Sequence, residues 1–508
     1  MNIVNVLEKC AKTYTDKPAI IFRQEQFSFA QLKDKVFSLS HALLELGVSP
    51  GDKVAIYLPN WPEYILSYLA IWSIGACSVP LDFMLTEDEI SSCLSHCEAK
   101  ILITKHKANI SLVSLKAKLP LLKDVILCQS KDEGALSFEE LISNHPASAP
   151  KTVIKDDDCA IIFYTSGTTG KPKGVLINYA QLDAPPKSMA FFVNSDLGPQ
   201  DTVLCALPFS HLGGLIYIQN TIVFGLRMVL MERFMPLDFL RNIQSYKVNF
   251  FWIVPSMYYA LLQLKEFETF DLSSLRWIVT FGASNSPEAL RRFQQFCPRT
   301  HLLNGWGLTE TNAPTVVIPM GSKNIESVGR PAPWIQVQIF SSDDQELPIG
   351  QIGEVAVKSW VVTPGYFKDE ALTRLTIRHG WFYTGDLGKF DAEGFLYIVG
   401  RKKEMIKVGG EIVFEPEVEA SLQKHPDIAE VAVIGVMDKL RGEVPKAFVV
   451  VREGKDITTD QLRYFLRQHL AHFKIPHYFE FCPALPKNRV GKIDKEQLRK
   501  RALADAGH

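Results

Sequence analysis

The sequence predicts an α/β fold in which a large N-terminal domain is followed by a small α/β C-terminal domain. The chain has 508 residues, too many for one hydrophobic core, which favours two or more domains. Of these residues 47% are hydrophobic, enough to fill such cores. Between about residues 50 and 300, short apolar strands alternate with segments of helical periodicity, which is typical of layered α/β structure.

Four strand–helix units and one further strand carry this alternation. We expect strands and following helices at residues 54–58 and 61–73, at 203–207 and from about 212, at 250–254 and 255–264, and at 277–281 with a helix that starts at Pro287. Ser286 suits the cap of that last helix and Pro287 its first position. The apolar run 160–163 predicts another buried strand.

The pattern changes at two points towards the C-terminus. Over residues 328–400 it becomes one of alternating strands, such as 336–339 and 354–357, punctuated by glycines. This texture predicts a β-rich subdomain that closes the large domain. A charged stretch follows Gly400 and leads into a compact α/β segment, so we place the domains at residues 1–400 and 401–508.

Composition and charge limit the classes of partner. The net charge of −1 gives no general attraction to nucleic acid or to acidic membranes, so no nucleic-acid partner is expected. Nine scattered cysteines without a CxxC pair indicate reduced thiols and a cytoplasmic location. The sequence shows no signal peptide and no apolar run of the roughly 18 residues that a membrane span needs. Peripheral membrane contact, a monomer and a homodimer all remain compatible with it.

A loop rich in Gly, Ser and Thr follows the strand predicted at 160–163. Its glycines fall where the chain leaves the sheet, so bare backbone N–H groups can point at an anion. It is not a Walker loop, because two residues rather than four separate Gly167 from Gly170, and Pro172 follows Lys171. The expected phosphate-binding residues are Thr165, Ser166, Gly167, Thr168, Thr169, Gly170 and Lys171.

The sequence YTSGTTGKPKG in this loop resembles the phosphate-loop signature of the acyl-adenylate-forming enzymes, the superfamily of acyl-CoA synthetases, luciferases and peptide-synthetase adenylation domains. Further motifs follow in family order, and the resemblance runs from about residue 18 to the GKID sequence at 491. It implies an enzyme that uses ATP and Mg²⁺ to convert a carboxylic acid into acyl-AMP and then transfers the acyl group to coenzyme A. It also implies a mobile C-terminal domain.

The sequence NGWGLTET at residues 304–311 resembles the aromatic-Gly-x-Thr-Glu motif of this superfamily. Trp306, beside Gly307, would offer a flat face to adenine, although most relatives carry Tyr at this position. Thr309 would offer a hydroxyl to the α-phosphate, and Glu310 a hard oxygen ligand to Mg²⁺. Three small residues are also expected at the nucleotide site: Gly282, Ala283 and Ser284.

The sequence YTGDL at residues 383–387 resembles the ribose-binding motif. The resemblance implies that Asp386 accepts hydrogen bonds from both ribose hydroxyls, with Arg401 as its companion. Lys492 resembles the lysine that bridges the acyl carboxylate and the α-phosphate during adenylation, a task suited to a long cationic side chain.

Lys403 occupies the position of the family hinge, about which the C-terminal domain rotates between the two half-reactions. Lys407, Gly409 and Gly410 are then expected on the face that receives coenzyme A, where glycines let the backbone approach the thin pantetheine arm. Ile412 replaces the Asn that usually follows this motif.

His211 resembles the histidine at the carboxylate end of the acyl pocket. No Asp occurs between Leu207 and Leu215, which argues against an amino acid substrate. Apolar or small residues at 212–218, 251–253 and 281–284 would line a hydrophobic tunnel, or simply belong to the core. We expect a medium- or long-chain fatty acid, with an arylcarboxylate as the alternative.

Two other functions remain open from sequence. An acyl-AMP ligase could load a carrier protein instead of coenzyme A, although no long insertion precedes the hinge. A degenerate relative could bind nucleotide without catalysis. The latter is disfavoured because Glu310, Asp386, Arg401 and Lys492 are all present.

Overall fold

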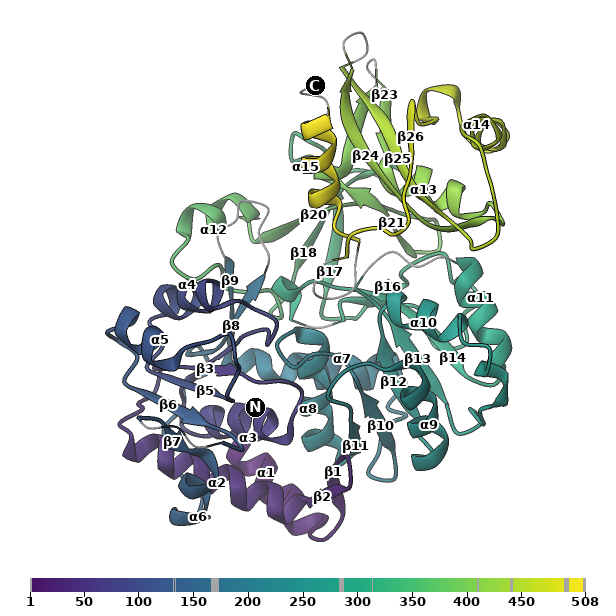
Figure 1. Cartoon of the computed structure of the whole chain (residues 1–508). Helices are drawn as coiled ribbons and strands as arrows, with labels where there is room; N and C mark the ends of the chain where they lie inside the picture. The colour runs from purple at the N-terminus through teal and green to yellow at the C-terminus, as the bar shows by residue number, and fades with distance from the viewer. Residues whose placement is uncertain are drawn as a thin grey trace.

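A computed structural model describes residues 2–130, 132, 134–165, 173–282, 287–312, 314–408, 411–438, 442–487 and 493–505. Over these residues the strands form four sheets, and a smaller C-terminal unit stands above the large N-terminal part (Figure 1). The mixed α/β architecture confirms the predicted fold class.

The first sheet has the strand order β7-β6-β5-β3-β4-β8-β9. Its strands run parallel except for β9, which is antiparallel to β8 at one edge. The strand predicted at 160–163 is confirmed as part of β8. The bounds are β3 (Lys53–Tyr57), β4 (Cys77–Pro80), β5 (Ile101–Thr104), β6 (Asp124–Leu127), β7 (Leu136–Ser137), β8 (Cys159–Thr165) and β9 (Lys173–Asn178).

The second sheet has the order β16-β15-β14-β13-β12-β10-β11-β1-β2 and is parallel from β14 to β1. Its parallel strands are buried and rich in apolar residues, as expected for strands covered on both faces. The bounds are β1 (Pro18–Phe22), β2 (Glu25–Ser28), β10 (Thr202–Cys205), β11 (Arg227–Leu230), β12 (Phe250–Ile253), β13 (Trp277–Thr280), β14 (His301–Trp306), β15 (Val316–Val317) and β16 (Arg330–Pro331).

A layer of helices separates these two sheets: α1 (Ile3–Thr13), α2 (Phe29–Glu45), α3 (Pro62–Ser73), α7 (Ala184–Phe192) and α8 (Leu212–Phe224) (Figure 1). Helix α3 packs on the first sheet and α8 on the second. Every residue of α3 except Glu63 is buried, which explains why its sequence is apolar on all faces. The predicted helix at 61–73 is thereby confirmed, and Pro62 occupies its first turn.

The remaining helices of the N-terminal part cover the outer faces and edges. They are α4 (Glu87–Cys97), α5 (Leu112–Lys118), α6 (Phe138–Asn144), α9 (Pro236–Tyr246), α10 (Pro255–Leu262), α11 (Pro287–Phe296) and α12 (Glu370–Thr376). Helix α11 starts at the predicted Pro287, whereas its expected cap, Ser286, lies outside the described residues.

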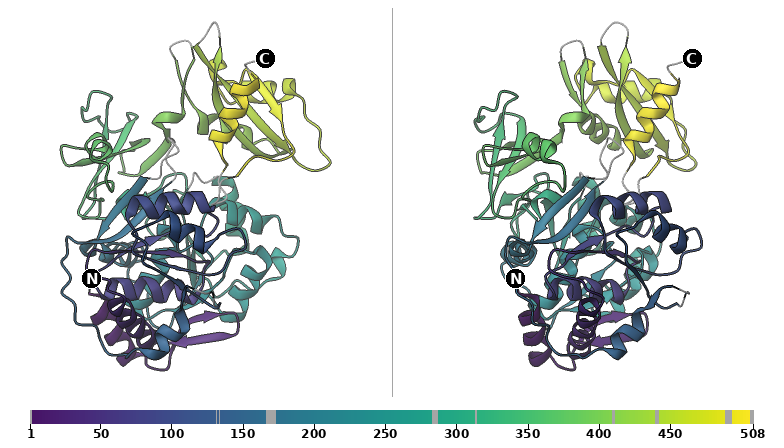
Figure 2. Two further views of the ribbon diagram at one scale, coloured as in Figure 1. Left: turned by 60° about the vertical axis from the view of Figure 1, so that its left-hand side comes forward. Right: turned by 90° about the vertical axis from the view of Figure 1, so that its left-hand side faces the viewer.

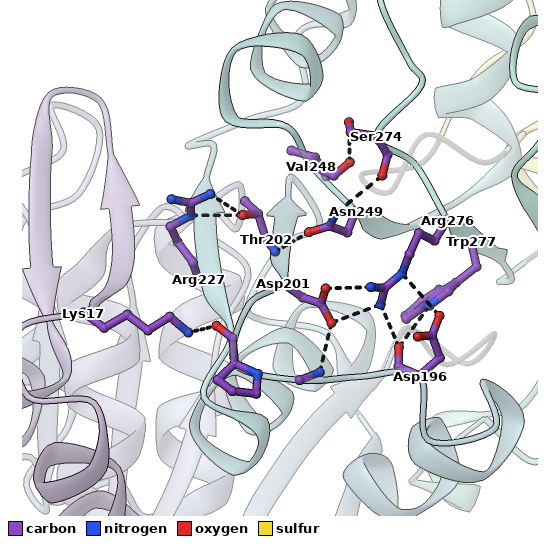
Figure 3. Close-up of polar contacts among 12 residues, drawn as sticks. Lys17, Asp196, Asp201, Thr202, Arg227, Val248, Asn249, Ser274, Arg276 and Trp277 are labelled. Atoms are coloured by element: carbon purple, nitrogen blue, oxygen red, sulfur yellow. Dashed lines mark hydrogen bonds and ion pairs between the residues drawn. The ribbon is translucent and has the colours of Figure 1, made fainter.

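An ion pair between a buried carboxylate and a half-buried guanidinium joins two loops at the amino edge of the second sheet (Figure 3). Asp201 precedes β10, and its side chain is only 1% exposed. Arg276 precedes β13 and donates from Nη1 and Nη2 to the two carboxylate oxygens of Asp201, across 2.9 and 3.0 Å. Arg276 also donates to the backbone carbonyl of Asp196. These contacts join the loops that precede β10 and β13.

A third sheet, of order β17-β18-β20-β19 with β21 beside β20, confirms the predicted β-rich subdomain. A fourth sheet, of order β23-β22-β25-β24 with β26 beside β25, forms the C-terminal unit with three helices (Figure 2). The bounds are β17 (Gln336–Phe340), β18 (Gly353–Lys358), β19 (Ile377–Arg378), β20 (Trp381–Phe390), β21 (Leu396–Arg401), β22 (Met405–Val408), β23 (Glu411–Phe414), β24 (Ile428–Asp438), β25 (Gly442–Val451), β26 (Tyr478–Phe481), α13 (Glu415–Gln423), α14 (Thr459–Arg467) and α15 (Lys495–Asp505).

Strand β21 ends at Arg401 and β22 begins at Met405, so the boundary predicted after residue 400 falls near the junction of the third and fourth sheets. The exact boundary stays a prediction. Within the described parts of the chain, no helix combines the length and the apolar character that crossing a bilayer requires.

Candidate active site

The predicted site residues of the N-terminal part lie in segments that follow parallel strands or in the third sheet. Thr165 ends β8, His211 follows β10, Gly282 follows β13, and Thr309 follows β14. Loops at the carboxyl ends of parallel strands are the usual position of ligand sites in open α/β sheets. The two large sheets therefore direct these residues to carboxyl edges.

The β8–β9 hairpin holds both ends of the predicted phosphate loop. Thr165 pairs directly with Lys173, so the chain leaves and re-enters the sheet at neighbouring positions. A Cβ on Gly174 would come within 2.8 Å of Ile162 Cγ2, which explains a glycine there. Thr165 is half-buried. The other predicted loop residues, Ser166, Gly167, Thr168, Thr169, Gly170 and Lys171, lie outside the described residues.

Glu310 lies in a short 3-10 turn, η3 (Thr309–Thr311), which two residues separate from the end of β14. Its side-chain Oε1 accepts a hydrogen bond of 2.9 Å from the hydroxyl of Tyr366, and its backbone carbonyl accepts one of 2.7 Å from the N–H of Thr363. Burial and the negative charge of Glu310 raise the pKa of Tyr366 well above its usual range. The phenol therefore stays protonated at neutral pH and acts as the donor. Thr309 is half-buried in the same turn.

Tyr366 was not foreseen from sequence. It also links Glu310 to the β8–β9 hairpin, because it forms an isolated bridge with Val175, and the N–H of the next residue, Phe367, donates to the carbonyl of Gly174. No short motif could reveal this tyrosine, since it is 56 positions from Glu310.

Two of the predicted nucleotide residues, Trp306 and Arg401, contact the carboxylate of a third, Asp386. The indole Nε1 of Trp306 donates to Asp386 Oδ2 across 2.8 Å, and Arg401 Nε lies 2.7 Å from Asp386 Oδ1. Asp386 and Arg401 are opposite each other on β20 and β21. Asp386 is 3% exposed, so the Arg401 charge offsets the cost of burying the carboxylate. The neighbouring Gly307 is half-buried.

The structure adds a role for Trp306 that the sequence did not suggest. Sequence analysis assigned to it only an adenine-stacking face, whereas its ring nitrogen contacts Asp386 and the residue is 8% exposed. The residue type could have predicted such a contact. Unlike Phe, Trp carries a ring N–H donor, and a buried ring N–H usually has an acceptor.

His211 is the N-cap residue of α8, and its ring Nε2 lies 3.8 Å from Asp82 Oδ2. Within the described parts of the chain, this buried nitrogen has no hydrogen-bond partner. Asp82, which sequence analysis did not single out, follows β4 at the carboxyl edge of the first sheet. The pair therefore joins loops from the two large sheets.

The segment before His211 is held by the side-chain amide of Asn60. Its Nδ2 donates to the carbonyl of Leu207 across 2.8 Å, and its Oδ1 accepts from the N–H of Phe209 across 2.9 Å. These bonds explain why β10 ends at Cys205, earlier than the predicted residue 207, because the chain beyond it pairs with Asn60.

The predicted tunnel residues pack closely at the start of α8. A Cβ on Gly214 would lie 2.2 Å from the carbonyl oxygen of Pro208, and one on Gly213 would lie 3.2 Å from the ring of Phe281. One turn further, Tyr217 is fully buried, and its hydroxyl bonds to the backbone carbonyl and N–H of Trp252. Gly282 is exposed with φ of +90°, while Ala283 and Ser284 lie outside the described residues.

The predicted C-terminal residues are described in part. Lys403 lies in the 3-10 turn η4 (Lys402–Glu404) between β21 and β22, where burial and the charge of Arg401 lower its pKa. Lys407 is exposed on β22. The remaining predicted residues of this unit, Gly409, Gly410 and Lys492, lie outside the described residues.

The segment after Lys492 is anchored by ion pairs that sequence analysis did not identify. Lys487 and Ile493 form an isolated bridge on either side of residues 488–492. Lys495 Nζ lies 3.0 Å from Glu415 Oε2 and 2.7 Å from Glu419 Oε1. Burial acts to lower the pKa of Lys495, but the two carboxylates outweigh it and raise the pKa to about 12.

Comparisons with known proteins agree over nearly the whole chain. A model of the AMP-binding enzyme family matches residues 7–367, and a model of the AMP-binding enzyme C-terminal domain matches residues 417–492. The chain is 33% identical over 530 residues to a long-chain-fatty-acid–CoA ligase of Bacillus subtilis (strain 168), covering 99% of this chain and 94% of the relative.

Solved structures of CoA ligases also align with nearly the whole chain. An anthranilate CoA ligase in complex with anthranoyl-AMP aligns with a TM-score of 0.93 and 27% identity, over 100% of this chain and 98% of that one. An o-succinylbenzoate coenzyme A synthetase from Bacillus subtilis, in complex with ATP and magnesium ion, aligns with a TM-score of 0.85 and 28% identity, over 97% and 99% of the two chains.

Proposed function

Because the chain belongs to the family of AMP-binding enzymes, we propose that it joins a carboxylic acid to coenzyme A, with ATP and Mg²⁺. In the first half-reaction a carboxylate oxygen attacks the α-phosphorus of ATP, and pyrophosphate leaves as acyl-AMP forms. In the second, the thiol of coenzyme A attacks the acyl carbon, loses its proton, and AMP leaves. The observation that carries this proposal is the meeting of Trp306, Asp386 and Arg401 at one buried carboxylate.

Asp386 and Arg401 are assigned to the ribose of ATP. A buried carboxylate is an acceptor that can bind neighbouring hydroxyls, and the two donors already present hold it in one orientation. Trp306, Gly307 and the segment Gly282, Ala283 and Ser284 are assigned to the adenine side. Thr309 is assigned to the α-phosphate, and the loop from Thr165 to Lys171 to the outer phosphates.

The residues present also fit a magnesium ion. Glu310 supplies a half-buried carboxylate, the hard oxygen donor that Mg²⁺ prefers, and Tyr366 orients it through Oε1. When bound, Mg²⁺ would neutralise negative charge on the phosphates.

His211 and Lys492 are assigned to the reacting carboxylate, and Lys403 to the hinge between half-reactions. His211 lies at the start of α8 and its Nε2 is buried, which suits a residue at the inner end of a pocket. Lys407, Gly409 and Gly410 are assigned to the face that receives coenzyme A. Lys403 supports the hinge proposal by its place in a short turn between two sheets.

A medium- or long-chain fatty acid is the proposed substrate, supported by apolar residues along α8 and by similarity to the Bacillus fatty acid ligase. An arylcarboxylate is the second candidate. The specific observation in its favour is Tyr217, which fills the core about 6 Å beyond Gly213 along α8, at 1.5 Å rise per residue. A tyrosine held there would shorten a pocket that follows this face of the helix.

A panel of carboxylic acids tests the proposal. ATP–pyrophosphate exchange is measured with fatty acids of increasing length and with benzoate, anthranilate and o-succinylbenzoate, followed by addition of coenzyme A. We expect acid-dependent exchange and an acyl-CoA product. Acid-dependent exchange without any acyl-CoA would favour loading of a carrier protein, and no exchange with any acid would contradict the assignment as a ligase.

A further inference from the structure

The contact between Trp306 and Asp386 joins two separate parts of the fold. Trp306 is the last residue of β14 in the second sheet, whereas Asp386 lies within β20 of the third sheet. Their side chains meet through a hydrogen bond of 2.8 Å between residues that are 8% and 3% exposed. A bond this short and this buried is strengthened by the low dielectric of its surroundings.

Trp306 and Arg401 approach different oxygens of the Asp386 carboxylate. Trp306 Nε1 binds Oδ2, and Arg401 Nε binds Oδ1 from the opposite strand. The terminal torsion of an aspartate is broad, so the carboxylate plane is set by its partners and not by an intrinsic rotamer. Together the indole and the guanidinium determine that plane.

The indole fixes which partner donates in this hydrogen bond. An indole N–H can only donate, whereas a phenol at this position could donate or accept. Trp306 therefore never competes with Asp386 as an acceptor for a ligand hydroxyl.

We propose that Trp306 is a positioning residue for ribose recognition: through its indole N–H it holds the Asp386 carboxylate in the orientation that distinguishes ATP from 2′-deoxy-ATP. This inference rests on the proposed assignment of Asp386 to the ribose. A site built to bind a hydroxyl rejects an analogue that lacks it, provided that the acceptor is held in place.

The size of the effect follows from the bond that is lost. A hydrogen bond to a charged group contributes enough that its removal changes an equilibrium by about 10-fold or more. In Trp306→Phe we expect kcat/KM for ATP to fall by about 10-fold. We expect kcat/KM for 2′-deoxy-ATP to fall less, so the ratio of the ATP value to the 2′-deoxy-ATP value decreases.

The experiment measures this ratio for acyl-AMP formation in the full-length protein. Trp381→Phe is the matched control, because Trp381 lies on the same strand as Asp386 but packs its ring against Phe340. Trp306→His is the conservative variant, since its Nε2 occupies the same ring position as the indole nitrogen and can also donate. We expect the control to leave the ratio unchanged and the histidine to restore part of it.

A double-mutant cycle separates this inference from the function on which it rests. If Trp306 acts through Asp386, Trp306→Phe should not lower the ratio further in an Asp386→Asn background. One outcome overturns the role of Trp306 alone: Asp386→Asn removes the preference for ATP over 2′-deoxy-ATP, but Trp306→Phe keeps the ratio of the two kcat/KM values within twofold of the parent. If Asp386→Asn keeps the preference for ATP over 2′-deoxy-ATP, the ribose assignment itself is overturned. Should Trp306→Phe fail to fold, Trp306→Leu, which also lacks a ring N–H, takes its place in the same comparison.

Discussion

The hydroxyl of Tyr366 donates a hydrogen bond of 2.9 Å to Glu310, and the backbone of Tyr366 is bridged to Val175 of the β8–β9 hairpin. The carboxylate assigned to magnesium is therefore oriented by a residue that belongs to the same framework as the phosphate loop. Changes at either position should affect the metal dependence of adenylation before they affect the fold.

Glu310→Gln should weaken both Mg²⁺ dependence and adenylation, because the amide keeps the size of the side chain but loses the anionic metal ligand. Magnesium titrations of pyrophosphate release provide the measurement. If the titration curve and turnover matched those of the parent protein, Glu310 would have a structural role only.

Tyr366→Phe should raise the magnesium concentration needed for half-maximal adenylation by several-fold, because Glu310 loses the donor that orients it. The same titration checks it. Tyr397→Phe is a matched control, since that hydroxyl also bonds to a carboxylate, Asp391 Oδ2, outside the proposed site. Equal shifts in the two variants would contradict a specific role for Tyr366.

Lys492→Ala should slow acyl-AMP formation on the order of 10²-fold or more, while transfer from supplied acyl-AMP to coenzyme A is mostly retained. The reason is that this lysine is assigned only to the adenylation arrangement. The two half-reactions are assayed separately, with Lys487→Ala as the control because Lys487 pairs with Glu430. Equal damage to both half-reactions would falsify the assignment.

Lys403→Pro should preserve adenylation and abolish thioester formation, the reverse of the pattern expected for Lys492→Ala. Proline holds φ near roughly −65° and opposes a rotation that requires backbone change at this residue. Lys403→Ala removes the side chain but leaves φ free, so it should support both steps. Production of acyl-CoA by the proline variant at the parent rate would show that the hinge lies elsewhere.

Arg276→Met should lower the free energy of unfolding by about 3–5 kcal/mol, because it leaves the buried Asp201 carboxylate without its charge partner. Thermal unfolding is the measurement. Arg241→Met, which breaks an exposed pair with Asp238, should cost less than about 1 kcal/mol. Similar melting temperatures for the two variants would show that the Asp201 pair contributes little.

Local patterns predicted much of the secondary structure. Helical periodicity predicted α3 to within one residue, and the texture change near residue 328 predicted the third sheet. The end of β10 was predicted too late, because apolar character continues to Leu207 while the backbone there pairs with Asn60. A side chain 147 positions away is invisible to any local window.

The candidate groups were also recognisable in the sequence, because the Gly-rich loop, the Thr-Glu pair and the Asp after a glycine occur in the same order as the motifs of the family that the chain resembles. The sequence alone thus determined the α/β class, the order of its units and the residue types available for ligands. Only the tertiary structure decided that Tyr366 meets Glu310, 56 positions away, and that Trp306 meets Asp386, 80 positions away. Such contacts depend on how whole sheets pack against one another, and local periodicity carries no information about that packing.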